Sequence, residues 1–288
     1  MSAATMSAAP GARATAARNA SATTVPMVTT TVVVKLGGRV LTDPRLPIAL
    51  ATRFASAHQR IVVVHGAADE VSALQRAFGV TPTFVAGLRV TSADDIDRIR
   101  MALSGLANKR LTAALITAGI PAVGVSGEDG PILIADPADD GVLGAVGTVA
   151  AVHTALLDLL LGGGYLPVVA PLARAARTAG GPPPATAALN INADDGAATI
   201  AAALGAHELL LVADVERIRT RNGGANVLDR TAAEAAIASG EIQDGMAVKV
   251  RAALAALRSG VPRVRIGGVA MITGESAGTS IVPDGAES

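Results

Sequence analysis

Lysine is rare in this chain, and two of its lysines stand where a positive charge could take part in chemistry. The 288 residues include 24 lysines and arginines, of which only Lys35, Lys109 and Lys249 are lysine. Lys35 lies in the apolar run TVVVKLGG, directly before two glycines. A charged side chain is costly there unless it is paired or faces a ligand. The alternative is a strand-end lysine that extends to solvent. Lys249, near the start of a helical segment, is unremarkable by itself.

The stretch LNINADDGAAT, residues 189–199, is a second anomaly. Asp194 stands at the start of an alanine-rich segment, so it is a candidate for the N-cap of a helix. Capping does not explain Asn190 and Asn192, which alternate with apolar residues. These three side chains are therefore candidates for a binding or catalytic site.

Further candidates lie next to predicted turns. Arg89 is in the glycine-flanked stretch AGLRVTSADD, where the alternative is a solvated loop arginine. Asp214 ends the apolar run ELLLVAD, and ligands of open α/β sheets bind outside the carboxyl ends of strands. The turn after IVVVHG, at Gly66, is either a loop that holds an anion or an ordinary corner between a strand and a helix.

Several function classes are excluded by composition or by missing motifs. The formal net charge is zero and aromatic residues make up 1% of the chain, which argues against a nucleic-acid binder. The chain has no cysteine, so disulfides and zinc–thiolate sites are excluded, and the composition fits a reducing cytoplasm. The glycine-rich fingerprint of dinucleotide-binding proteins does not occur. The stretch GEIQDGM, residues 240–246, has the glycine spacing of a P-loop, but Met246 stands where the P-loop needs lysine. The apolar stretch 141–173 is broken by glycines and a proline and does not predict a membrane span.

Short apolar, often β-branched runs alternate with helical segments along most of the chain. This alternation predicts a three-layer α/β/α sandwich with a mainly parallel central sheet. The predicted strands are at 31–38, 61–66, 120–127, 132–136, 165–173, 208–214 and 262–268. The predicted helices are at 44–58, 94–119 (one helix or two), 152–164, 193–206, 231–240 and 246–260.

Two segments fall outside this pattern. Residues 1–28 are rich in Ala, Ser and Thr and predict a disordered tail. Residues 176–188, with Gly-Gly and three prolines, predict an exposed loop and not a domain boundary. We therefore expect a single domain over residues 29–288.

The motifs, taken in order, resemble the amino acid kinase family. They are VVVKLGG, VVVHGA, AGLRVT, ALSGLANKRL, GVSGEDG, LLGGGYLPVVAPL, LNINADDGAATIAAALGA, LLLVADV, DGMAVKVRAAL and ESAGTSI, and they run from about residue 32 to 282. The resemblance implies transfer of the γ-phosphoryl group of ATP to a carboxylate. It is greatest to members that phosphorylate the γ-carboxylate of N-acetyl-L-glutamate, a step of arginine biosynthesis. The alternatives are a kinase for N-succinylglutamate or a carrier-linked aminoadipate, and an inactive ligand-binding homologue.

The resemblance also implies roles for individual residues, with the substrate bound by the N-terminal half and ATP by the C-terminal half. Lys35 and Lys249 would flank the transferred phosphoryl group, with Asp194 holding both. The residues similar to the substrate-binding set are Gly66, Ala67, Ala68, Arg89, Asn190 and Asn192. Those similar to the ATP-binding set are Gly37, Gly38, Asp214, Gly245 and Met246. Mg²⁺ is expected on the phosphates without assigned protein ligands, and a homodimer is the expected assembly.

The chain departs from the family pattern at three places, the third of which is the stretch DVERI, residues 214–218, where the usual glycine after the strand is missing. The family usually reads H-G-G-G after the second strand, whereas this chain has Ala67 and Ala68 after Gly66. Glu128 replaces a common lysine in SGEDG. A Cβ at a glycine position is tolerated only if the turn does not need a positive φ. Either the turn persists with alanine, or the substrate pocket is reshaped.

Overall fold

The computed structural model describes residues 30–56, 59–85, 87–138, 142–176, 188–221 and 223–285. The predicted tail and nearly all of the predicted loop at 176–188 lie outside these ranges. Within them, no helix is both long enough and apolar enough to cross a membrane.

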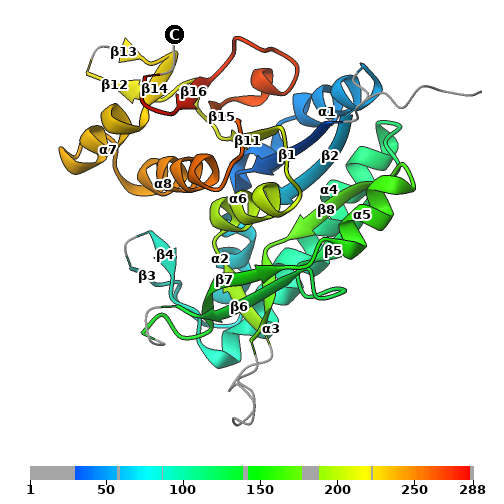
Figure 1. The fold of residues 1–288 in the computed structure, drawn as a ribbon. Coiled ribbons are helices and arrows are strands. Elements are labelled where there is room, and N and C mark those ends of the chain that lie inside the picture. Colours follow the sequence, from blue (N-terminus) through cyan, green and yellow to red (C-terminus); the bar gives the residue numbers. More distant parts are fainter. Residues whose placement is uncertain are drawn as a thin grey trace, which may run out of the picture.

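The central sheet has eight strands and is mainly parallel, as the sequence predicted (Figure 1). Every neighbouring pair is parallel except β15 and β16. The runs of β-branched residues form its inner strands because they are buried on both faces. In order across the sheet, the strands are β14 (Val227–Asp229), β16 (Thr279–Val282), β15 (Arg263–Gly267), β11 (Glu208–Val212), β1 (Thr30–Leu36), β2 (Gln59–His65), β8 (Leu166–Ala170) and β5 (Ala122–Ser126).

Helices cover both faces of this sheet, which gives the predicted three layers. Val32 and Val34 of β1 pack in one apolar cluster with α1 (Arg45–Ser56) and α4 (Asn108–Thr117). Val33 points to the opposite face and packs in the second cluster. That cluster includes residues of α5 (Ala155–Gly162), α6 (Ala193–Ala203), α7 (Arg230–Ala238) and α8 (Asp244–Arg258).

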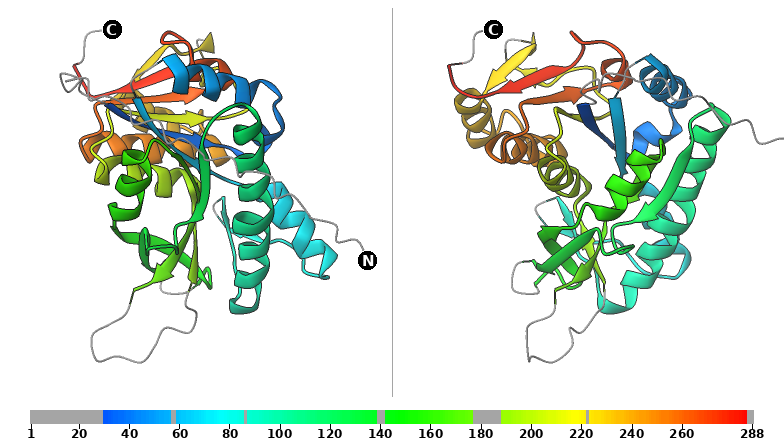
Figure 2. Two further views of the ribbon diagram at one scale, coloured as in Figure 1. Left: turned by 90° about the vertical axis from the view of Figure 1, so that its right-hand side faces the viewer. Right: turned by 45° about the vertical axis from the view of Figure 1, so that its right-hand side comes forward.

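A second, smaller sheet was not predicted. Its four strands pair in a closed ring in the order β10 (Ala188–Ile191), β7 (Val146–Val152), β6 (Leu133–Pro137) and β9 (Leu172–Ala175). The strand predicted at 165–173 divides at Pro171, which has no N–H to continue the ladder. Its first part is β8 of the large sheet and its second part is β9 of the ring. Figures 1 and 2 show the ring at the end of the molecule that also holds α3, opposite α7 and β14.

The remaining elements are short or irregular. The helix predicted at 94–119 is a continuous helical run of α3 (Ile96–Arg100), a π-helical turn (Met101–Ala107) and α4. It ends at Thr117, and Gly119, whose φ of 88° favours glycine, follows the C-cap residue. Helix α2 (Ala68–Ala77) was not predicted. Among the described residues, the minor elements are two hairpins, β3 (Phe84–Val85) with β4 (Leu88–Arg89) and β12 (Arg219–Thr220) with β13 (Gly223–Gly224), and three 3₁₀ turns, Gly38–Thr42, Ala93–Asp95 and Val269–Ile272.

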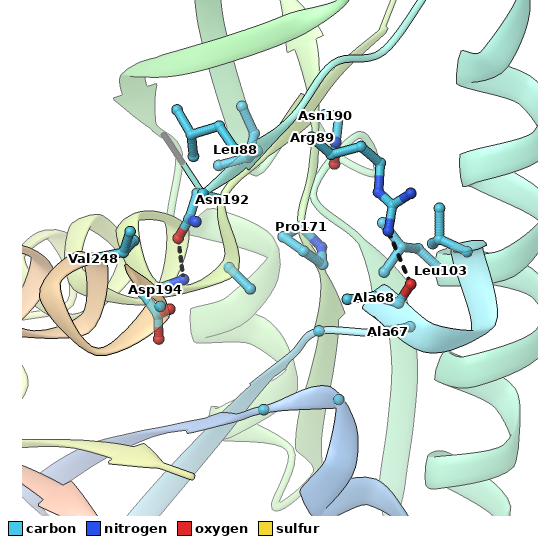
Figure 3. Close-up of a pocket in the computed structure, with 18 of the residues that line it drawn as sticks. Ala67, Ala68, Leu88, Arg89, Leu103, Pro171, Asn190, Asn192, Asp194 and Val248 are labelled. Atoms are coloured by element: carbon cyan, nitrogen blue, oxygen red, sulfur yellow. Dashed lines mark hydrogen bonds between the residues drawn. The ribbon is translucent and has the colours of Figure 1, made fainter. Parts of the chain in front are cut away.

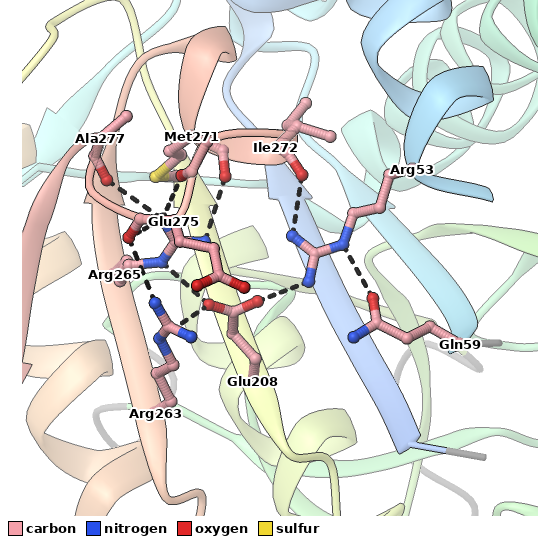
Figure 4. Close-up of polar contacts among 10 residues, drawn as sticks. Arg53, Gln59, Glu208, Arg263, Arg265, Met271, Ile272, Glu275 and Ala277 are labelled. Carbon is pink, nitrogen blue, oxygen red and sulfur yellow. Dashed lines mark hydrogen bonds and ion pairs between the residues drawn. The ribbon is translucent and has the colours of Figure 1, made fainter. Parts of the chain in front are cut away.

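A charged cluster closes the amino ends of β11 and β15 (Figure 4). Glu208 is buried and forms ion pairs with Arg53, Arg263 and Arg265. Arg265 also donates to the carbonyl oxygens of Met271, Gly274, Glu275 and Ala277. The cluster therefore fastens the segment between β15 and β16 to the sheet, at the opposite end of the strands from the glycine turns.

Candidate active site

Two glycine turns meet at the carboxyl ends of β1 and β2. The parallel register pairs Leu36 with His65, so the turns that follow these residues lie side by side. The amide of Gly66 donates to the carbonyl oxygen of Leu36 at 2.9 Å. A Cβ on Gly38 would stand 3.3 Å from the amide nitrogen of Ala68, a distance tight enough to favour glycine there. Backbone N–H groups and strand ends thus form the floor of a site at this edge.

A carboxylate lies between two ammonium groups above this floor. Lys35 Nζ is 2.8 Å from Asp194 Oδ1, and Lys249 Nζ is 3.0 Å from Asp194 Oδ2. The three residues come from β1, α6 and α8, so the ion pairs exist only in the folded chain. Lys35 and Asp194 are each 4% exposed. Two of the three lysines therefore share one buried carboxylate, and the third does not.

The sequence suggested that Asp194 caps helix α6, but Asn192 is the cap. The Asn192 side-chain oxygen accepts hydrogen bonds from the amides of Asp194 and Asp195 at 2.8 and 3.3 Å. Capping by Asn192 satisfies the exposed amides of the first turn. The Asp194 carboxylate is consequently free to bind both lysines.

Burial and the attraction between these charges shift their pKa values in opposite directions, and the balance keeps the Asp194 carboxylate ionised. Desolvation lowers the pKa of Lys35 to about 8, and the attraction of Asp194 opposes this shift. Burial alone would raise the pKa of Asp194, but Lys35 and Lys249 outweigh it and hold this pKa below its usual value. The group carries a net positive charge when both lysines are protonated, so it favours an anion.

A cavity of about 320 Å³ opens beside this group (Figure 3). Twelve of the fourteen predicted site residues line it, from β1, both glycine turns, β4, β10, α6 and α8. They are Lys35, Gly37, Gly38, Gly66, Ala67, Ala68, Arg89, Asn190, Asn192, Asp194, Gly245 and Lys249. The apolar side chains of Leu103, Val146, Pro171 and Ile191 form part of the wall.

Asp214 and Met246 do not line this cavity. Asp214 lies just after β11, where its carboxylate accepts a hydrogen bond from Arg39 Nη1 at 2.9 Å. This ion pair is exposed and borders a smaller cavity of about 180 Å³ that Gly268 also lines. Met246 is on the first turn of α8 and packs against the apolar core.

Arg89 is buried at the other end of the cavity from the lysines. Its Nη2 donates to the carbonyl oxygen of Ala68 at 2.9 Å and to Ser72 Oγ at 2.8 Å. Its Nη1 donates to Gln75 Oε1 at 2.5 Å, and its guanidinium stacks over Phe84 at 4.6 Å from the ring centre. Figure 3 shows the side chain extending from β4 towards the start of α2. Arg89 is thus not the solvated loop arginine of the alternative interpretation.

The two asparagines also lie on the cavity wall. Asn190 of β10 donates from Nδ2 to Thr91 Oγ1 at 3.2 Å. The N-cap bonds of Asn192 use only its side-chain oxygen, so its amide N–H groups are available to a ligand. Amide side chains on both sides of an apolar wall suit a ligand with polar groups on a short apolar chain.

The turn after β2 persists with alanine. Ala67 has φ of −160°, which is extended backbone that any residue adopts. Ala68 is the first residue of α2, and neither alanine is among the described non-glycine residues with positive φ. The sequence left open whether the turn persists with alanine or the pocket is reshaped, and in the structure the turn persists.

His65, the histidine of the run IVVVHG, is not one of the predicted site residues. It is fully buried, and burial lowers its pKa to about 4. Its Nδ1 donates to the carbonyl oxygen of Gly66 at 3.2 Å, and its Nε2 accepts from Asn108 Nδ2 at 3.1 Å. Asn108 also donates to Val168, so a neutral histidine ties β2 to α4 and β8 directly below the cavity.

No cluster of three His, Cys, Asp or Glu side chains that could hold a metal ion occurs within the described ranges. Glu128, at the second departure from the family pattern, is not in the cavity wall. It forms an ion pair with Arg100 at 2.9 Å. Its negative charge is therefore used in holding the SGEDG turn against the helical run of α3.

The chain is similar in sequence to known proteins. The sequence model described as "Amino acid kinase family" matches residues 30–268. The acetylglutamate kinase of Rubrobacter xylanophilus is 40% identical over 262 residues, which cover 89% of this chain and 98% of that protein. The acetylglutamate kinase of Geobacillus stearothermophilus is 42% identical over 240 residues, covering 82% and 89%.

Solved structures share the fold. The protein smu.665 of Streptococcus mutans superposes with a TM-score of 0.77 at 26% identity, covering 88% of this chain and 98% of that one. The carbamate kinase of Giardia lamblia, bound to citric acid, superposes with a TM-score of 0.67 at 15% identity, covering 89% and 99%. At that identity the second likeness concerns the fold alone.

Proposed function

The chain belongs to the amino acid kinase family, and on that premise we propose that it transfers the γ-phosphoryl group of ATP to the γ-carboxylate of N-acetyl-L-glutamate. The product is N-acetyl-L-glutamyl 5-phosphate, an intermediate of arginine biosynthesis. Relatives about 40% identical over most of the chain carry the name acetylglutamate kinase. The observation that supports the chemistry most directly is the buried group of Lys35, Asp194 and Lys249 beside two glycine turns.

Charge neutralisation is the main task of such a site. Both reactants are anions, so the transferring phosphoryl group must be approached by a carboxylate against electrostatic repulsion. We assign Lys35 and Lys249 to the phosphoryl oxygens, where ammonium groups fixed in a water-poor site stabilise developing charge. Asp194 positions both lysines. The nucleophile is a carboxylate that is already ionised at neutral pH, so the reaction needs no general base.

The substrate end of the site is assigned to the other side of the cavity. A buried guanidinium suits the α-carboxylate of the substrate, which supports this role for Arg89. Asn190 and Asn192 are assigned to the N-acylated amino group. The turn of Gly66, Ala67 and Ala68 is assigned to the γ-carboxylate and the transferring group, and its backbone amides would supply donors there.

ATP is assigned to the C-terminal half of the chain, except that Gly37 and Gly38 of the N-terminal half are also assigned to its phosphates. Gly37, Gly38 and Gly245 line the cavity on the lysine side, which supports their proposed contact with phosphates. Asp214 and Met246 would meet the nucleoside further out. Mg²⁺ would enter with ATP and neutralise its phosphates, with ligands mainly from phosphate and water, as this ion prefers.

A coupled assay tests the proposal. The assay follows the formation of ADP, or of the hydroxamate that hydroxylamine forms from the acyl phosphate. Either product should appear with N-acetyl-L-glutamate and should require both reactants. N-succinyl-L-glutamate and a carrier-linked aminoadipate serve as competing acceptors. Turnover only with one of these would reject the proposed substrate while retaining the kinase chemistry. Absence of turnover with every acceptor would favour the ligand-binding alternative, which the named relatives do not support.

We also propose a cytoplasmic homodimer. Strand β5 ends the large sheet, and an uncovered edge strand is a site for pairing with a second chain. Exposed apolar side chains lie on the elements next to this edge, namely Ile116 on α4, Leu159 on α5 and Tyr165 before β8. Gel filtration with light scattering should give twice the chain mass, and Ile116→Lys should shift the protein towards the monomer.

A further inference from the structure

Three neutral acceptors surround the Arg89 guanidinium. They are the Ala68 carbonyl oxygen, Ser72 Oγ and Gln75 Oε1, at 2.9, 2.8 and 2.5 Å. Residues 68, 72 and 75 are spaced by four and then three positions, which places them on one face of α2. Ser72 and Gln75 are buried behind Arg89 and are not part of the cavity wall.

The orientation of each acceptor is fixed. An arginine side chain has only donors, so Ser72 must accept from Nη2. The single hydroxyl hydrogen of Ser72 is directed to the Ala68 carbonyl oxygen at 2.7 Å, which leaves its lone pairs facing Arg89. By the same reasoning the amide oxygen of Gln75, and not its nitrogen, faces Nη1. These contacts hold the plane of the guanidinium.

The contacts hold Arg89 without neutralising it. Arg265, another buried arginine, contacts the carboxylate of Glu208, and the partly exposed Arg98 contacts Asp95. Among the described residues, no carboxylate pairs with Arg89 in this way. Burial lowers the pKa of Arg89, which reflects the cost of a charge held away from water. That cost is recovered when an anion enters the cavity.

The hydrogen bonds also select which donors remain. A guanidinium has five N–H groups, and the three acceptors use both hydrogens of Nη2 and one of Nη1. The Nε–H and the second Nη1–H have no acceptor within the described part of the chain. These two N–H groups point from different edges of the guanidinium plane, so an anion in the cavity can accept a hydrogen bond from one of them.

We propose that Gln75 and Ser72 are positioning residues that set the affinity for the substrate carboxylate by holding Arg89 charged and correctly oriented through neutral acceptors. The inference rests on the proposed function, because it assigns Arg89 to that carboxylate. A carboxylate at position 75 would pair with Nη1 and cancel the charge that attracts the substrate. An apolar side chain of similar length at 75 would remove one of the three contacts that fix the plane.

Steady-state kinetics of wild type, Gln75→Glu, Gln75→Met and Ser72→Ala test this inference. Gln75→Glu should raise KM for the acylated amino acid about 10-fold or more, as expected for loss of a charge-assisted hydrogen bond. Its kcat and its KM for ATP should stay within about 3-fold, since the lost interaction is uniform binding. Gln75→Met and Ser72→Ala should raise the same KM by roughly 3- to 10-fold. If Gln75→Glu does not fold, the KM of Gln75→Met for the acylated amino acid tests the inference instead.

Ala73→Glu is the matched control, because it adds the same charge to the exposed face of α2. It should leave every constant unchanged. An unaltered substrate KM in folded Gln75 variants would overturn the inference, and so would an equal rise of KM in Ala73→Glu. A purely structural role would lower the melting temperature without moving the substrate KM.

A second readout does not depend on the reaction. The guanidinium of Arg89 can be observed by ¹⁵N NMR, and its signals are assigned as those that disappear in Arg89→Lys. In the wild type, the hydrogen bonds should slow rotation of the guanidinium and give separate signals for the two Nη atoms. The signals should merge in Gln75→Met. Merged signals in the wild type would refute the positioning role. Absence of turnover by a wild type with separate signals would instead reject the proposed function alone.

Discussion

Lys35 and Asp194 form a buried ion pair of 2.8 Å between β1 and α6, and Lys249 of α8 pairs with the other carboxylate oxygen of Asp194. Replacing one lysine should leave the carboxylate paired with the other, so the fold should survive. Removal of a fixed charge from a phosphoryl-transfer site costs about 100- to 1,000-fold in kcat. We expect Lys35→Met to lower kcat by at least this factor, with an unchanged circular dichroism spectrum.

The third lysine provides the control for this experiment. Lys109 donates to the carbonyl oxygen of Gly124 at 2.7 Å and does not line the cavity. Lys109→Met removes the same charge from the chain, and its kcat should stay within about 3-fold of wild type. Equal losses in the two variants would mean that overall charge, and not the position of Lys35, governs the rate.

The pH dependence of the reaction should report the protonation of Lys35. Burial lowers the pKa of this group to about 8, and only the ammonium form can stabilise the phosphoryl group. As pH rises through 8, the ammonium fraction falls, so kcat/KM should decline above that pH. Bound phosphates favour the ammonium form, so kcat should decline at a higher pH than kcat/KM. A flat kcat/KM profile up to pH 10 would contradict this assignment.

His65 should make the protein sensitive to acid. Its pKa falls from 6.5 to about 4 on folding because of burial, so the unfolded chain binds its proton first as pH drops. Its contribution to stability is therefore complete above pH 6.5 and is lost between 6.5 and 4. The shift corresponds to about 3 kcal/mol. Urea unfolding of wild type and His65→Gln across this window should show a weaker pH dependence in the variant.

A second histidine separates this effect from general acid sensitivity. His153 is exposed at the end of β7. His153→Gln should keep the wild-type pH dependence of the free energy of unfolding. If His65→Gln also keeps it, the buried histidine is not the group that destabilises the protein in acid.

Glu208 should be far more important for stability than for activity. It is the shared carboxylate of three arginines at the amino ends of the strands, away from the cavity. Glu208→Gln removes the carboxylate that these arginines share, and breaking a buried ion pair from one side costs about 3–5 kcal/mol. Urea unfolding should show this loss, while KM values of the folded enzyme stay unchanged. Glu234→Gln, which removes an exposed pair with Arg258, should have almost no effect.

Much of this architecture follows from local patterns in the sequence. The β-branched runs at 31–38 and 61–66 identify inner strands because only a sheet covered on both faces buries every residue of a run. The register of β1 and β2 brings the two glycine turns together. From the sequence alone, the motifs around Lys35 and Gly66 were placed in one site only through the resemblance to the amino acid kinase family. The small ring was missed because β9 and β10 are only four residues long, which is too short for a pattern of side chains to identify a strand.

The polar contacts behind the site are less predictable. Asn192 and Asp194 are both ordinary N-cap residues, and only the structure shows that Asn192 accepts the amides while Asp194 binds the lysines. Gln75 and Asn108 act through partners distant in sequence, Arg89 and His65, so no spacing identifies them. Their signal in the sequence is limited to a polar side chain on an otherwise apolar helix face, which solvent exposure explains equally well.

The alanine at position 67 should stabilise the turn at no cost to the reaction. Ala67 is buried, with φ of −160°, so a Cβ meets no backbone strain there. Glycine would add conformational freedom to the unfolded chain, and Ala67→Gly should lower the free energy of unfolding by about 0.4–1 kcal/mol. Because the turn already has the alanine-compatible geometry, KM for the acylated amino acid should stay within about 3-fold. Urea unfolding and steady-state kinetics measure both quantities. A gain in stability, or a 10-fold gain in kcat/KM, would show instead that the methyl group of Ala67 obstructs the pocket.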